Sequence, residues 1–183
     1  IPGIKVVIPS NPYDAKGLFT AALRDPDPVI FFHYGQIDAT KVDVPDESYV
    51  VNIGEAAIRQ EGSDITITGF GGAAVEILKA NADLKTAGIS AEIIDPRTLK
   101  PLPIDPIIKS VRKTGKLLVI DHGHESHGTA SEIISRVAMA VPGAKFGRST
   151  FPDSPPPGAK GMITWMTPDA SKIVIAAKQM MQS

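Results

Sequence analysis

The sequence has 183 residues, a net charge of −1 and no cysteine, and these features already limit what the protein can do. With 43% hydrophobic and 21% charged residues, the chain can form the core of a globular protein. The balanced charge provides no basic field for nucleic acid or for an anionic membrane, and the lack of cysteine excludes disulfides and thiolate metal sites. We therefore expect no nucleic-acid partner, no membrane partner and a cytoplasmic protein.

The beginning of the chain predicts one β-α-β unit. A β-branched run at 5–9 is followed by a helix over 12–24, in which Asn11 is the cap and Pro12 takes the first helical position. The segment 28–33 then predicts a second buried strand. Because one such unit cannot bury a core of its own, other elements must complete its sheet, and we interpret the chain as a fragment.

After this unit, residues 34–54 carry charges and prolines with little periodicity, which predicts a linker. From residue 55 onward, strands and helices alternate. The strands are expected at 55–60, 64–69, 90–94, 116–120 and 144–149. The helices are expected at 73–87, 103–113 and 129–141, with a last helix that Thr167 caps after a proline-rich loop. This alternation predicts an α/β fold of three layers, with a mostly parallel sheet covered by helices on both faces.

The stretch "IDPRTLKPLP" (94–103) lies at the carboxyl end of a predicted buried strand, where open α/β sheets place their binding loops. Pro96 ends the strand and Pro103 begins the next helix. Asp95 and Arg97 therefore lie on a stiffened loop. We expect an ion pair that holds the crossover connection, and direct contact with a ligand is the alternative.

Four segments carry a resemblance to a known family. They are "VVIPSNPYDAKGLFTAALRDPDPVIFF", "GEAAIRQEGSDITITGFG", "AGISAEIIDPRTLKPL" and "KTGKLLVIDHGHESHGTASEI". In this order and spacing they resemble the C-terminal part of the beta subunit of thiamine-diphosphate-dependent 2-oxo acid dehydrogenases, which include the pyruvate, branched-chain and acetoin dehydrogenases. The resemblance implies a remnant of the pyrimidine-binding domain at 1–33, a linker at 34–54 and a transketolase C-terminal-like domain at 55–183.

The resemblance also implies an activity and its partners. The family oxidatively decarboxylates a 2-oxo acid and transfers the acyl group to lipoyl groups. Its activating glutamate and a substrate histidine precede Ile1, and its alpha subunit holds thiamine diphosphate and magnesium. This chain alone is therefore expected to be inactive, with no catalytic or cofactor-binding residue of its own.

The partners that the resemblance implies are an alpha subunit, a second beta subunit and a lipoyl acyltransferase core. The loops 94–103 and 121–128 are expected at or beside the contact between two beta subunits. Three alternatives remain open: an acetoin dehydrogenase beta subunit, a transketolase-like or deoxyxylulose-phosphate-synthase-like domain, and a non-catalytic interaction module.

One metal site of the family falls partly within this chain. The resemblance implies that Ala22, Leu23, Asp25 and Asp27 supply oxygen ligands, largely main-chain carbonyls, to a structural potassium ion. A helix C-terminus offers unpaired carbonyls and the negative end of a dipole, which suits a cation. Asp27 departs from the asparagine that is frequent in the family, and an ordinary capped helix end is the alternative.

Two further motifs leave their roles open. His122, His124 and His127 follow a predicted strand, and imidazoles with Glu125 could bind zinc or nickel. A polar loop at a subunit interface or active-site edge is the other interpretation. The glycines of "TGFGG" (68–72) lie between a strand and a helix, where a phosphate can bind, but they do not form the G-x-G-x-x-G fingerprint.

Overall fold

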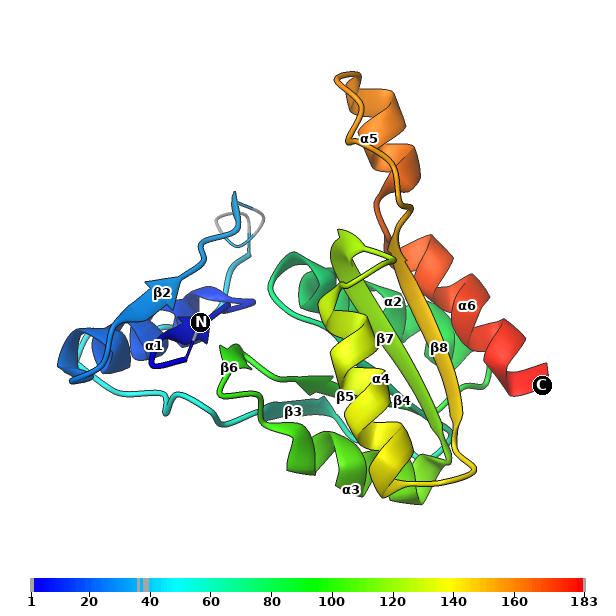
Figure 1. Ribbon diagram of the computed structural model, residues 1–183, viewed down its shortest axis with the longest axis horizontal. Coiled ribbons are helices and arrows are strands. Elements are labelled where there is room, and N and C mark those ends of the chain that lie inside the picture. The colour runs from blue at the N-terminus through cyan, green and yellow to red at the C-terminus, as the bar shows by residue number, and fades with distance from the viewer. Residues whose placement is uncertain (1, 36, 38–39, 183) are drawn as a thin grey trace.

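The computed structural model describes residues 2–35, 37 and 40–182, which form two blocks side by side (Figure 1). The N-terminal block contains the described residues up to 53, and the C-terminal block contains residues 54–182. The predicted linker at 34–54 includes positions 36, 38 and 39, which lie outside the described residues. Every helix in the described part of the chain is too short or too polar to cross a membrane.

The C-terminal block is built on a five-stranded sheet with the order β3-β5-β4-β7-β8. Its strands are β3 (Ala57–Gln60), β4 (Ile65–Thr68), β5 (Ala91–Asp95), β7 (Lys116–His124) and β8 (Lys145–Phe151). The strands β5, β4, β7 and β8 run parallel, and only the edge strand β3 is antiparallel to its neighbour β5. The predicted mostly parallel sheet is therefore confirmed.

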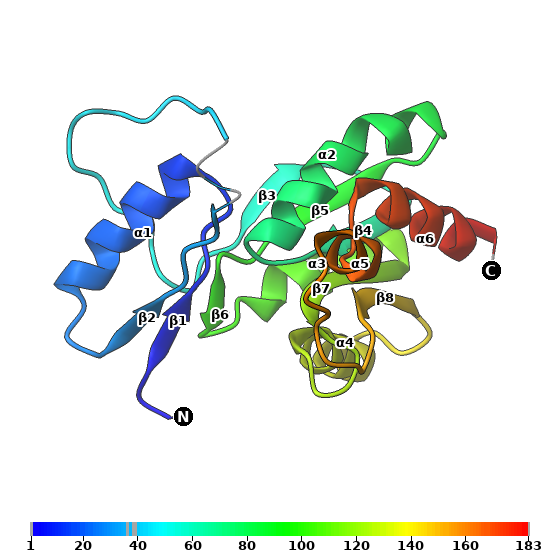
Figure 2. The ribbon, with the colours of Figure 1, turned by 90° about the horizontal axis from the view of Figure 1, so that it is seen from above.

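Helices cover both faces of this sheet, as the alternation of elements predicted (Figure 2). Their bounds are α2 (Gly72–Thr86), α3 (Ile104–Thr114), α4 (Thr129–Ala140) and α6 (Ala170–Gln182). The first core cluster lies between the sheet and the pair α2 and α6, and the second lies between the sheet and the pair α3 and α4. On α3, Ile107 and Val111 are fully buried at the spacing of one helical face. The result is the expected three-layer α/β fold.

The N-terminal block has a three-stranded sheet with the order β2-β1-β6 and one helix against it. Its own elements are β1 (Lys5–Val7), α1 (Pro12–Arg24) and β2 (Val29–Phe31), and the C-terminal block contributes the third strand, β6 (Thr98–Lys100). The Asp14 amide donates to the Asn11 side chain at 2.8 Å, which confirms the predicted cap of α1. The predicted linker returns along α1, where a Cβ atom on Gly17 would lie 2.5 Å from Val51 Cγ2. Glycine at this position therefore permits the close approach.

Several details differ from the expectations. The predicted buried strand at 28–33 was wrong in its burial, because β2 has Ile30 44% exposed. β6 was missed, since it is a three-residue strand flanked by prolines, and it joins the N-terminal sheet by pairing antiparallel with β1. A short helix, α5 (Lys160–Met166), interrupts the predicted proline-rich loop and stands away from the sheet (Figure 1). The predicted cap of the last helix was wrong, because the side chain of Asp169 accepts the Lys172 amide at 2.9 Å, whereas Thr167 Oγ1 donates back to Ile163.

Candidate functional site

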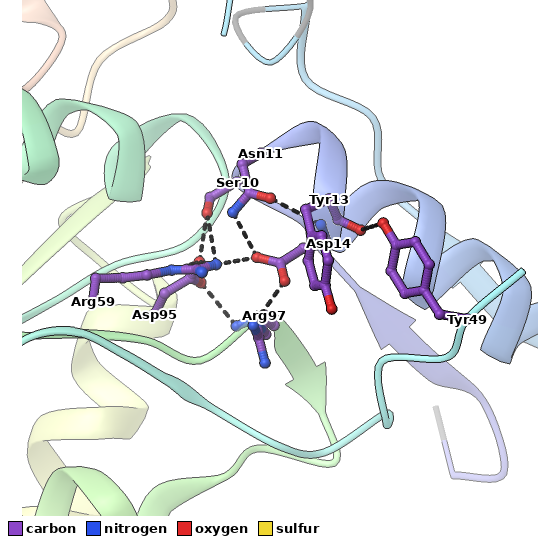
Figure 3. Close-up of polar contacts among 8 residues, drawn as sticks. All are labelled: Ser10, Asn11, Tyr13, Asp14, Tyr49, Arg59, Asp95 and Arg97. Atoms are coloured by element: carbon purple, nitrogen blue, oxygen red, sulfur yellow. Dashed lines mark hydrogen bonds and ion pairs between the residues drawn. The ribbon is translucent and has the colours of Figure 1, made fainter. Parts of the chain in front are cut away.

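A buried cluster of charges lies where the two blocks meet (Figure 3). Asp95, at the carboxyl end of β5, has no exposed surface and lies 2.7 Å from Arg59 on β3. Arg59 also contacts Asp14 of α1, and Ser10 donates its hydroxyl to Asp95. Arg97 reaches the second oxygen of Asp14 at 2.7 Å. Two carboxylates and two guanidinium groups thus balance each other in a place that solvent barely reaches.

Asp95 and Arg97, which were expected to form an ion pair, each form an ion pair with another residue in the structure. The Arg97 amide donates to Asp95 at 3.0 Å, but the guanidinium crosses to Asp14 in the other block. Arg97 has φ +59°, a left-handed conformation that is uncommon for a residue with a side chain. Its carbonyl accepts the Ile8 amide at 2.7 Å, which fixes this turn against the N-terminal sheet. The loop therefore joins the blocks rather than only its own crossover.

Arg59 is the centre of this cluster, and its electrostatics explain its position. Burial lowers the pKa of Arg59, but Asp95 and Asp14 outweigh that effect, so the pKa lies above its ordinary value. A guanidinium stays protonated at every physiological pH and offers several donors in a fixed geometry. Sequence reasoning did not select Arg59, because the segment around it, "EAAIRQE" (55–61), mixes polar and apolar residues and gives no local signal.

The predicted potassium ligands lie together at the end of α1, but an ammonium group already contacts their carboxylates. Lys5 donates to both oxygens of Asp25, at 2.7 and 2.8 Å, and lies 3.2 Å from Asp27. The hydrogen bond from Lys5 lowers the pKa of Asp25. The Ala22 carbonyl accepts the Asp25 amide at 3.3 Å. A potassium ion here would have to rely on main-chain carbonyls, including that of Leu23, and the site stays a prediction.

The histidine loop, residues 121–128, begins on the last four residues of β7, which extends beyond the predicted strand, and two of its imidazoles point toward main-chain carbonyls. His122 Nε2 lies 3.3 Å from the Pro168 carbonyl, and His124 Nδ1 lies 3.0 Å from the Pro152 carbonyl. Burial lowers the pKa of His122. Across the described residues, no group of three or more His, Asp or Glu side chains is arranged to hold a metal ion. The geometry favours the interpretation of a polar loop.

The glycine-rich turn before α2 packs against the N-terminal block. Gly71 has φ +48°, and a Cβ atom there would lie 2.9 Å from Ile8 and 3.0 Å from Tyr34. A Cβ atom on Gly69 would lie 2.6 Å from the Ile120 carbonyl. Glycine at these two positions therefore permits the close approach of Ile8, Tyr34 and the Ile120 carbonyl, and packing explains both glycines.

A cavity of about 880 Å³ opens beside the edge strand β3, between β5 and α3. Its wall includes Glu92, which is 5% exposed, lies 2.8 Å from Lys113 and accepts the Ser110 hydroxyl. Sequence reasoning did not select this cavity, although an acid within the apolar run "SAEII" was a signal. Glu92, the one buried acid of this wall, is already paired with Lys113 and Ser110. The cavity therefore shows no pair of carboxylates arranged for acid–base catalysis.

The comparisons with known proteins agree with this fold. Residues 54–173 match the family described as transketolase, C-terminal domain. The chain belongs to this family. It is 38% identical to the pyruvate dehydrogenase E1 component subunit beta of Bacillus subtilis, over 99% of this chain and 57% of that protein.

Two further relatives extend the comparison. The chain is 40% identical to the beta subunit of an acetoin:2,6-dichlorophenolindophenol oxidoreductase of Cupriavidus necator, over 100% of this chain and 55% of that protein. A solved structure of a split gene transketolase, described as an inactive beta4 tetramer, superposes with a TM-score of 0.83 at 21% identity, over 100% of this chain and 58% of that chain. This transketolase C-terminal family member thus spans little more than half the length of the relatives it matches, while the likeness runs along its whole length.

Proposed function

We propose that the chain is part of the beta subunit of a 2-oxo acid dehydrogenase, in the component that decarboxylates the substrate. The parent enzyme would oxidatively decarboxylate a 2-oxo acid and transfer the acyl group to lipoyl groups. One observation carries the proposal: 38% identity over 99% of the chain to a protein named as a pyruvate dehydrogenase beta subunit. An acetoin-cleaving enzyme is the second candidate, supported by 40% identity to the acetoin oxidoreductase subunit.

The proposed cofactors are thiamine diphosphate and magnesium. When bound, thiamine diphosphate supplies the nucleophilic carbon and the electron sink of the reaction. As the resemblance to the family implies, we assign the ligands of the diphosphate and of magnesium to the alpha subunit. Potassium at Ala22, Leu23, Asp25 and Asp27 remains part of the proposal, held by main-chain oxygens beside the Lys5 ammonium.

The proposed role of this part of the subunit is assembly. We divide it into a pyrimidine-domain remnant at 1–33, a linker at 34–54 and a transketolase C-terminal-like domain at 55–183. Its partners would be the alpha subunit, a second beta subunit and the lipoyl acyltransferase core. The buried charges of Asp14, Arg59 and Asp95 support this role, since they join the two blocks.

An activity assay of the complete enzyme tests the proposal. The full gene that encodes this chain would be co-expressed with its alpha subunit, and dye reduction measured with pyruvate, a branched-chain 2-oxo acid and acetoin. We expect thiamine-diphosphate-dependent activity with one of them, and none from this chain alone. A stable alpha–beta complex that turns over none of the three would contradict the proposal.

A transketolase remains to be separated from these candidates. The solved structure with the same fold is that of a split gene transketolase, so a divided gene does not by itself indicate a dehydrogenase. Adding a ketose phosphate with an aldose phosphate acceptor to the assay resolves the two classes. Transfer of a two-carbon unit between the sugars, with no dye reduction, would identify a transketolase.

A further inference from the structure

One wall of the cavity beside β3 is apolar. The cavity lies between α3 and the edge of the sheet, and its volume of about 880 Å³ is in the range of sites that hold small molecules. Ile58 of β3 is 57% exposed at this edge, and Ile94 of β5 and Ile108 of α3 line the same cavity. Three elements thus contribute isoleucines to a surface that the apolar part of a ligand can cover.

The basic side chains of the cavity come from α3. Lys109, Arg112 and Lys113 line it at the i, i+3 and i+4 spacing of one side of a helix. Lys113 lies 2.8 Å from the buried carboxylate of Glu92, which balances its charge. Lys109 and Arg112 have no hydrogen-bond or ion-pair partner in the part of the chain that the structure describes. Two cationic groups at this cavity are therefore available to an anion.

The acids of the cavity decide where an anion can lie. Asp105 is in the first turn of α3, where the helix dipole favours a carboxylate, and it precedes Arg112 by about 10 Å along the helix. Glu61 follows β3, and with Glu92 it is outnumbered by the three bases in the second half of α3. The anionic group of a ligand therefore fits beside Lys109 and Arg112, away from Asp105.

We propose that this cavity binds an amphipathic monocarboxylate, whose chain covers Ile58 and Ile108 and whose head group lies beside Lys109 and Arg112. A carboxylate accepts two parallel N–H groups from a guanidinium, which makes it a better partner than a neutral hydroxyl. Because the cavity shows no pair of carboxylates arranged for acid–base catalysis, the site serves binding and not a second reaction. It goes beyond the proposed function and does not depend on which activity the parent enzyme has.

Matched ligands test the two parts of this site. Octanoate, octanol and octylamine share one chain length and differ in the head group, and each would be titrated into the chain by isothermal titration calorimetry. We expect octanoate to bind at least about threefold more tightly than octanol, and octylamine to bind most weakly, because the cations attract only the carboxylate. Hexanoate should bind more than about tenfold more weakly than octanoate, since each buried methylene tightens binding about fourfold.

Isoleucine methyl resonances locate the bound chain. With labelled δ1-methyl groups, octanoate should shift the resonances of Ile58, Ile94 and Ile108. The resonance of Ile175, which is 56% exposed on α6, should stay in place. Ile58→Ser should weaken octanoate and octanol by the same factor, about tenfold, because it removes apolar surface that both chains cover.

The double variant Lys109→Gln/Arg112→Gln removes the two unpaired cations. Its affinity for octanoate should fall to that for octanol, while the affinity for octanol stays unchanged. The matched control is Arg136→Gln, which removes a half-exposed guanidinium of α4 that pairs with Glu132 and should change neither affinity. Circular dichroism and the urea midpoint establish that each variant folds.

Three results would overturn the proposal. Octylamine that binds as tightly as octanoate would show that the cations of α3 do not select the head group. Equal shifts at Ile58 and Ile175 would show that the chain of the ligand contacts any exposed apolar surface. No binding of octanoate at millimolar concentration would exclude this class of ligand. None of these results bears on the dehydrogenase assignment, which the activity assay tests by itself.

Discussion

At Asp14 and Asp95, burial removes water from two carboxylates, and nearby donors replace it. Each carboxylate has no exposed surface, and each is paired with Arg59. Leaving either charge without its partner would cost far more than the pair contributes, because an uncompensated buried charge is strongly unfavourable. The Lys5–Asp25 pair is different in kind, since the ammonium is 29% exposed and such pairs contribute little to stability. Ion pairs of aspartate thus join the two blocks where they are buried with Arg59 and are ordinary surface charges where the partner is Lys5.

His122 should make the protein less stable as the pH falls below neutrality. Burial lowers the pKa of His122, and the Pro168 carbonyl, Glu76 and Asp121 offset this effect only in part. The unfolded chain then binds the proton more readily than the folded one, so the stabilisation is complete above about pH 6.5 and is lost as the pH falls toward the folded pKa. Urea unfolding at about pH 7.5 and about pH 5.5 measures the loss.

The control for this effect is His122→Gln, which keeps a donor for the Pro168 carbonyl but does not titrate. Its free energy of unfolding should change less between the two pH values than that of the wild type. Equal changes in both proteins would show that His122 does not carry the pH dependence.

At the scale of single elements, the sequence predicted the helices and strands that have a local periodic pattern. It missed the elements that are ordered by contacts with residues far away in sequence. The helix α1 carries its cap, its first-turn proline and its acid within four residues, so local chemistry determined where it begins. The strand β6 has no pattern of its own, because its three residues are ordered by β1, far away in sequence. Arg59 was missed for the same reason, since its role depends on carboxylates from two other segments.

The start of α6 tests this distinction directly. Sequence reasoning selected Thr167 as the cap, but Asp169 accepts the Lys172 amide, and its hydrogen bond with Ser171 is the main cause that lowers the pKa of Asp169. Asp169→Ala should therefore lower the free energy of unfolding by about 1 kcal/mol, the usual cost of losing a helix cap. Thr167→Ala should have the smaller effect in the same urea titration. The reverse order would favour Thr167 as the cap.

At the scale of the whole molecule, three kinds of contact join the two blocks. β6 leaves the C-terminal block and completes the N-terminal sheet, which Figure 2 shows at the boundary between them. Gly71, at the start of α2, allows Ile8 and Tyr34 to approach. The third contact is the pair of ionic interactions that Arg59 makes with Asp14 and Asp95. Because each contact joins segments from both blocks, we expect the blocks to unfold together in one cooperative transition.

Arg59→Met provides the test of that coupling. The substitution keeps much of the side-chain volume but leaves Asp14 and Asp95 buried beside a single remaining guanidinium, so it should lower the free energy of unfolding by about 3–5 kcal/mol. Lys79→Met, which removes an exposed partner of Glu76, should change it by less than about 1 kcal/mol. Native-state hydrogen exchange shows which block loses stability. In Arg59→Met, the free energy of opening should be lower for the amides of α1 than for those of β4, whereas in the wild type the two should be equal. If α1 and β4 keep equal protection in Arg59→Met, the strand pairing of β1 with β6 is sufficient to join the blocks, and the buried charges only add to the stability of the whole.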